Sequence, residues 1–264
     1  MQITKRHWVV AITGFVVAVA AVFGWTHRAG APAPVETLNA LTASSSESVA
    51  PVAQATTTSV TIKQFPIHAA DTIISWNFKG VDTGDATRTA QTNADIANLK
   101  SLLGTGKYDD YDLYLGMGND NNLLGNGKGA YQNFNISISI HPKKGLAYAN
   151  LAHLMDELGA YYTAADAFAQ AVAVEPGTLM YHLDRIAYLT RQFPKDNARI
   201  TAALTDANKQ FGDNASILTI EAQWLSGQGR YADAIKAWET VKVLSPGKDT
   251  TAVDAEIARL QAKQ

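Results

Sequence analysis

Residues 155–176 read MDELGAYYTAADAFAQAVAVEP, and two further stretches share this design: LLGNGKGAYQNFNISISIHP at 123–142 and LSGQGRYADAIKAWETVKVLSP at 225–246. In each stretch a glycine is followed five residues later by an alanine, four further on by an aromatic residue, and eight beyond that by a proline. The prolines Pro142, Pro176 and Pro246 are 34 and then 70 residues apart. This spacing indicates a repeat of about 34 residues, with the proline missing from one copy.

The residue types at these positions suit a pair of closely packed helices. A glycine ends the first helix because it readily adopts a left-handed backbone conformation. A small alanine lets the two helices approach closely, and the aromatic side chain fills the gap between neighbouring hairpins. Proline ends the second helix because it cannot continue the helical hydrogen bonds. The pattern therefore predicts an all-α chain of stacked helical hairpins.

The pattern resembles the tetratricopeptide repeat (TPR), a family in which each repeat is a pair of antiparallel helices. The resemblance is carried by Gly159, Tyr161, Ala164, Phe168, Ala171 and Pro176, and again by Gly229, Tyr231, Ala234, Trp238, Val241 and Pro246. The first copy departs from it with Gly127 at the tyrosine position. The resemblance implies a right-handed α-solenoid of four hairpins, at 111–144, 145–178, 179–214 and 215–248.

The third hairpin, 179–214, is predicted from spacing more than from its residues. Arg185 lies where the family usually has a buried leucine, and Phe193-Pro194-Lys195 replaces the glycine turn. The sequence LMYHLDRIAYLTRQF is expected to form its first helix and DNARITAALTDANKQF its second.

The segments on either side of the repeats have their own patterns. Val253, Ile257 and Leu260 share one helical face, which predicts a capping helix within 249–264. Within 65–110, Asp85 is expected to begin a helix that ends near residue 103. Before that helix, DTIISWNFKGV (71–81) is rich in β-branched and aromatic residues and predicts an extended segment lying on the first hairpins.

The N-terminal segment, 1–28, is predicted to be a membrane anchor. Residues 8–25, WVVAITGFVVAVAAVFGW, contain no charge and would span about 27 Å as a helix. Lys5 and Arg6 precede this run and only Arg28 follows it closely, which predicts a single-pass inner (plasma) membrane protein with a cytoplasmic N-terminus. A cleaved signal peptide is the alternative, and it would leave a secreted or periplasmic protein. Residues 29–64, rich in Ala, Pro, Ser and Thr, are predicted to be a disordered linker.

Composition argues against several classes of function. The absence of cysteine removes thiol chemistry and cysteine-based zinc sites, and a net charge of −2 offers no basic surface for nucleic acid. The histidines lack metal-binding spacing, and the Asn- and Gly-rich stretches 116–122 and 125–129 lack the endings of a calcium loop and a phosphate loop. The carboxylates of 109–112 are expected to cap a helix. No catalytic, cofactor or metal site is predicted, and an enzyme is not expected because only about 46 residues lie outside the linker and repeats.

In proteins of the resembled family the concave face is lined largely by the first helix of each repeat. This implies a partner-binding face made of Leu115, Asn119, Asn122, Ala149, Asn150, His153, Leu183, Asp184, Ala187, Thr219 and Gln223. Some family members bind an acidic peptide end with lysine and arginine on this face, but this chain has none at the corresponding positions, and Asp156, Glu157 and Asp184 lie near it. The expected partner is a neutral to basic protein segment.

Two functions follow as hypotheses. The first is a membrane-tethered, extracytoplasmic scaffold for complex assembly in a bacterial cell envelope. The second is a periplasmic chaperone or cytochrome-maturation helper that binds unfolded segments. Capture of one stoichiometric partner would favour the first, and general suppression of aggregation would favour the second.

Overall fold

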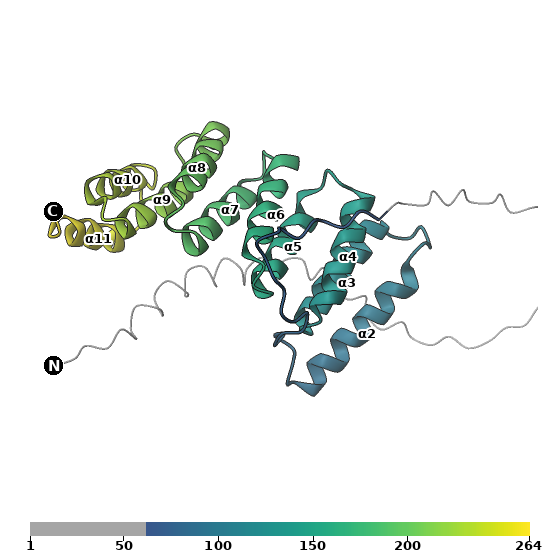
Figure 1. The fold of residues 1–264 in the computed structure, drawn as a ribbon. Helices are drawn as coiled ribbons and strands as arrows, with labels where there is room; N and C mark the ends of the chain where they lie inside the picture. The colour runs from purple at the N-terminus through teal and green to yellow at the C-terminus, as the bar shows by residue number, and fades with distance from the viewer. Residues whose placement is uncertain (1–61) are drawn as a thin grey trace, which may run out of the picture. The chain divides into compact units, whose positions relative to one another are not determined.

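The computed structural model describes residues 62–264, which belong to one compact unit. Within this range the chain forms ten helices and no strand, so the predicted all-α class is confirmed for these residues (Figure 1). The helices are α2 (Ala86–Leu102), α3 (Asp110–Leu123), α4 (Gly127–Ile140), α5 (Gly145–Glu157), α6 (Tyr161–Val174), α7 (Leu179–Gln192), α8 (Asn197–Phe211), α9 (Ala215–Gly227), α10 (Tyr231–Val243) and α11 (Thr251–Gln261).

Eight of these helices form four hairpins, α3–α4, α5–α6, α7–α8 and α9–α10. Each hairpin packs on the next, because α4 contacts α5, α6 contacts α7 and α8 contacts α9 (Figure 1). Two helices thus occur in each of the four repeats expected from the sequence. Gly125, Gly159 and Gly229 all have φ between 71° and 75° in the turn after the first helix, which explains glycine at these positions.

The recurring residues form the interior of this stack. Ala130, Ala164 and Ala234 are completely buried, and the aromatic residues that follow them, Phe134 and Trp238 among them, are at most 7% exposed. Close packing also explains a glycine inside α3, because a β-carbon on Gly118 would lie 2.4 Å from the Phe134 ring. The predicted roles of the small and aromatic residues are confirmed by this burial.

The degenerate third hairpin is present. Asp196 begins α8 by accepting a hydrogen bond from the backbone N–H of Arg199, so a side-chain cap follows the turn that lacks glycine. Arg185 replaces a buried leucine and its guanidinium lies 2.9 Å from the Asp206 carboxylate on α8. The Arg185–Asp206 ion pair therefore replaces the apolar contact that the resemblance implied at this position.

Helices α2 and α11 cover the two ends of the hairpin stack. Asp85 accepts hydrogen bonds from the N–H groups of Thr87 and Arg88, so α2 begins where the sequence predicted, and the helix packs on α3. At the other end α11 packs on α10 with Ile257 and Leu260 buried, as expected of a capping helix.

Residues 62–80, here called the strap, contain no helix and lie along α4, α5 and α6. Its backbone is held by hydrogen bonds to side chains of these helices: the Phe65 N–H donates to Asn135, the Tyr131 hydroxyl donates to the Phe65 carbonyl over 2.6 Å, and the His68 N–H donates to Thr163 Oγ1 over 2.9 Å. Figure 1 shows this segment crossing the first two hairpins. The predicted extended segment is therefore present, and it begins before residue 71.

Asp71 of the strap caps a helix that is distant in sequence. The N-cap residue of α6, Ala160, has no side chain able to accept a hydrogen bond. The Asp71 carboxylate instead accepts from the N–H groups of Tyr162 and Thr163 over 3.2 and 2.6 Å, and from Thr163 Oγ1 over 2.7 Å. A carboxylate at this place also interacts favourably with the helix dipole. The strap is thus fixed to the second hairpin by a charge-assisted contact.

The predicted anchor lies outside the described residues, as does the predicted linker except for 62–64. In that remainder the Lys63 N–H donates to Ser139 Oγ over 3.1 Å. Among residues 62–264, none of the helices is long and apolar enough to span a membrane.

Candidate partner-binding face

The helices α3, α5, α7 and α9, each the first of its hairpin, carry all of the predicted partner-binding residues. We call their exposed and partly exposed predicted positions the first-helix face. Three of these residues are exposed, namely Asn119, His153 and Gln223. Six are partly exposed, namely Asn122, Asn150, Leu183, Asp184, Ala187 and Thr219.

The prediction was wrong for Leu115 and Ala149, which are 8% and 4% exposed and belong to the core. The reason is that α3 packs between α2 and α4, while α5 packs against α3, α4 and α6. A helix enclosed by several neighbours keeps fewer open positions than a helix packed on one side only. Leu115 and Ala149 therefore pack in the core behind the face and expose little surface to a partner.

Two predicted asparagines are brought together across successive hairpins. The Asn150 side-chain amide donates a hydrogen bond to Asn119 Oδ1 over 2.8 Å, which joins α5 to α3. Nearby, Asn122 Oδ1 is buried and has no hydrogen-bond partner within residues 62–264. Amide groups at such positions can bond to the backbone of an extended segment, since each carries both donors and an acceptor.

The acidic character expected of the face is reduced at Asp156. Its carboxylate accepts hydrogen bonds from Arg191 over 2.6 Å and from Gln192 over 2.8 Å, both at the end of α7. The contact joins α5 to α7 and offsets the charge of Asp156. Sequence reasoning missed this pairing, because the relative rotation of α5 and α7 decides whether Arg191 reaches across.

His153 and Asp184 keep no such partner. No hydrogen bond or ion pair joins either side chain to another residue in the described part of the chain, although the edge of the His153 ring contacts Phe168 at a centroid distance of 5.0 Å. Desolvation lowers the pKa of His153 and raises the pKa of Asp184 to about 6. Both shifts favour the neutral form, so neither group stabilises a charge on the other.

Solvent access and desolvation occur together at His153 and Asp184. His153 is exposed and Asp184 partly exposed to solvent, yet the protein around them displaces enough water to shift both pKa values. Because the pKa of Asp184 is near 3.8 in the unfolded chain and about 6 in the folded one, its ionisation lowers the stability of the fold as pH rises from about 4 to about 6, and this loss is complete above that range.

The other sequence motifs have structural roles. Residues 116–122 lie inside α3, and Asn126 in the glycine-rich stretch accepts a hydrogen bond from the Gly129 N–H at the start of α4. Asp109 caps α3 by accepting from the Tyr111 N–H, as expected, and its carboxylate also lies 2.8 Å from His141 Nε2. Within residues 62–264 no group of three or more His, Asp or Glu side chains is arranged to hold a metal ion.

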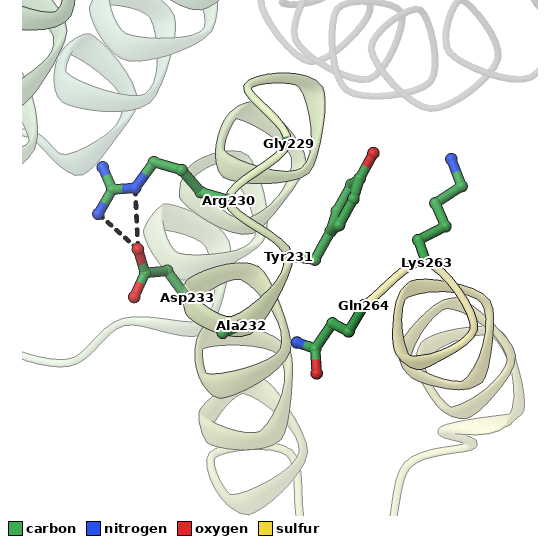
Figure 2. A pocket seen from close by; sticks show the side chains of 7 residues that line it. All are labelled: Gly229, Arg230, Tyr231, Ala232, Asp233, Lys263 and Gln264. Carbon is green, nitrogen blue, oxygen red and sulfur yellow. Dashed lines mark hydrogen bonds and ion pairs between the residues drawn. The ribbon is translucent and has the colours of Figure 1, made fainter.

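A separate pocket of about 480 Å³ lies near the start of α10 and the end of α11 (Figure 2). Its lining residues are Gly229, Arg230, Tyr231, Ala232, Asp233, Lys263 and Gln264. Arg230 is paired with Asp233 over 2.6 Å, and the Lys263 ammonium lies 5.6 Å from the centre of the Tyr231 ring. The pocket contains none of the predicted binding residues, and no sequence motif indicated it.

No protein-family model matches the sequence, and no curated protein does. Among solved structures, MamA is 15% identical and similar over 69% of this chain and 98% of its own, with a TM-score of 0.47. A thermophilic TPR protein from Thermus thermophilus is 16% identical over 66% of this chain and 92% of its own, with a TM-score of 0.45. The TPR2AB domain of yeast Sti1, solved in complex with pHSP90, is 14% identical over 69% of this chain and 86% of its own, with a TM-score of 0.36.

Proposed function

We propose that this chain is a protein-binding scaffold that holds a segment of a partner protein on the first-helix face. The observation that carries the proposal is Asp184, a partly exposed but desolvated carboxylate without a partner among the described residues. A charged group kept in such a place destabilises the free protein, and a bound partner can satisfy it. The exposed Asn119, His153 and Gln223 extend the same face over α3, α5 and α9.

The proposed partner segment is neutral to basic. Asp184 and Glu157 bring negative charge to this region, and desolvation raises the pKa of Glu157 as well. The nearby arginines offer little to an acidic ligand, because Arg185 is paired with Asp206 and Arg191 with Asp156. An acidic segment would meet uncompensated carboxylates, so we expect it to be disfavoured.

The location and the lack of catalysis are parts of the same proposal. The apolar run 8–25, with its preceding basic residues, supports an anchor in the inner membrane and a repeat domain outside the cytoplasm. Fractionation of cells tests the anchor: the full chain is expected with the membranes, and a chain lacking 1–28 is expected in the soluble fraction. Recovery of the full chain from the soluble fraction would contradict it.

Site-specific photocrosslinking in intact cells tests the binding face. A photoreactive amino acid placed at Asn119, His153 or Gln223 of the full chain is expected to capture the same partner from all three positions. The matched control is Asp166, an exposed residue on α6 that lies outside the face. Equal capture from position 166, or three unrelated sets of products, would contradict binding at the first-helix face.

A further inference from the structure

The basic side chains nearest to Asp184 in the sequence each interact with another group of the chain. Arg185 reaches the Asp206 carboxylate on α8 over 2.9 Å, and Arg191 reaches Asp156 on α5 over 2.6 Å. His182 is buried, with its Nε2 atom 2.9 Å from the carbonyl of Pro176. Asp184 is thus a carboxylate that the described part of the chain leaves without a cation.

An internal comparison shows what is unusual about this position. Asn119 and Asn150 are 31 residues apart and are joined by a side-chain hydrogen bond between α3 and α5. His153 and Asp184 have the same separation one repeat later, on α5 and α7, but no bond joins them. A salt bridge would raise the pKa of the histidine and lower that of the carboxyl group, whereas both shift in the opposite direction. The side-chain bond that joins the first pair is therefore absent from the second pair.

The residues around Asp184 restrict the kind of ligand that it could bind. Met180 and Ala187 lie one helical turn before and after Asp184, and Leu183 is adjacent; all three are partly exposed. A carboxylate bordered by apolar side chains suits a ligand with a cationic end and an aliphatic stem. A metal ion fits poorly, because no cluster of three His, Asp or Glu side chains occurs in the described range.

We infer that Asp184 is the specificity residue of the first-helix face and binds a lysine or arginine side chain of the partner segment, with His153 as a second hydrogen-bond acceptor. The inference rests on the proposed function, since it names the residue type that a bound segment must carry. A neutral imidazole has one nitrogen that accepts a hydrogen bond, and a carboxylate accepts several, so both suit an ammonium or guanidinium group. The Asn119–Asn150 pair one repeat earlier can bond to the backbone of the same segment.

Selection from a random peptide library tests this assignment on the full chain. We expect the wild type to enrich peptides with a lysine or arginine at one fixed position, and Asp184→Asn to lose that enrichment. Asp184→Lys is expected to reverse it toward aspartate and glutamate. The matched control is Asp166→Asn, which removes an exposed carboxylate on α6 and should enrich the same peptides as the wild type.

Affinity measurements on one enriched peptide make the test quantitative. Replacing its selected lysine by norleucine should weaken binding to the wild type by about tenfold or more, because a charge-assisted hydrogen bond is lost. In a double-mutant cycle, the same lysine-to-norleucine replacement should not weaken binding to the Asp184→Asn variant, because the carboxylate that the lysine contacts is already absent. Circular dichroism establishes that each variant is folded, and neutral Asn at this desolvated position is expected to be tolerated.

The outcomes separate this inference from the proposed function. If crosslinking places a partner on the face but the selected peptides carry no fixed cation, the specificity inference is wrong and the scaffold function stands. Cation enrichment that survives in Asp184→Asn would also overturn the inference. If no peptide is enriched and no partner is captured from the face, both proposals fail.

Discussion

The second hairpin, 145–178, and the fourth, 215–248, carry the same sequence pattern but have different surroundings. Their turn glycines have φ of 74° and 75°, and Ala164 and Ala234 are both completely buried. The second hairpin has other hairpins on both sides and the strap along α6, whereas the fourth is covered at its far end by the single helix α11. Equal repeat patterns therefore do not imply equal stability, because neighbouring segments contribute part of it.

The contrast is clear at the helix N-termini. Neither α6 nor α10 has a side-chain cap from its own N-cap residue, Ala160 or Arg230. Asp71 supplies the missing acceptor to α6 from the strap, while α10 has only Asp233 in its first turn, which is exposed and paired with Arg230. We expect the fourth hairpin to open locally before the second.

The largest expected effect is that of Phe168→Ala, which should lower the free energy of unfolding by about 3–5 kcal/mol. The ring is 1% exposed and packs against Tyr188 at a centroid distance of 5.0 Å, so its removal leaves a cavity between two hairpins. The matched variant Trp238→Ala should cost less, because Trp238 is 7% exposed, near the end of the stack, and its indole N–H has no partner among the described residues. Urea unfolding followed by circular dichroism measures both. A larger loss for Trp238→Ala would contradict the proposed difference between the hairpins.

A smaller effect, of about 2 kcal/mol, is expected for Asp71→Ala, because hydrogen bonds to a charged group are lost at the start of α6. Hydrogen exchange should show faster exchange of the amides of Tyr162 and Thr163. Asp233→Ala is the control in the fourth hairpin and should change stability by less than about 0.5 kcal/mol, since it removes an exposed ion pair. Unchanged exchange at Thr163 in Asp71→Ala would show that the strap does not stabilise the second hairpin.

The difference between Asp71 and Asp233 also shows how far the sequence predicts this molecule. Repeats are predictable because each is a local pattern whose small, aromatic and helix-ending residues have the same neighbours in every copy. The start of α2 at Asp85 was predictable for the same reason, since a cap and its helix are adjacent in sequence. Asp71 and Thr163 are 92 residues apart, so no local pattern could indicate that one caps the helix of the other.

The candidate face was predicted less completely than the fold. The register of the repeat placed His153 and Asp184 on it, but it could not show that Ala149 is enclosed or that Asp156 is paired with Arg191. Both features depend on how helices from different repeats rotate against each other. Spacing within one repeat does not determine that rotation. Contacts between repeats therefore need the structure, whereas contacts within a hairpin can be read from the sequence.

The smallest expected effect is a loss of stability of equal size in the second and the fourth hairpin. Gly159→Ala and Gly229→Ala should each cost about 1 kcal/mol, because both residues have a left-handed backbone and a new β-carbon would meet no atom within 4 Å. Gly227→Ala is the control, since this residue ends α9 without a positive φ and also has open space around it, so alanine should be neutral or slightly stabilising. Thermal unfolding of the three variants measures these differences. If only Gly159→Ala lowers the stability, the neighbouring segments alter the geometry of the turn. The second and fourth hairpins would then differ in local geometry as well as in what covers them.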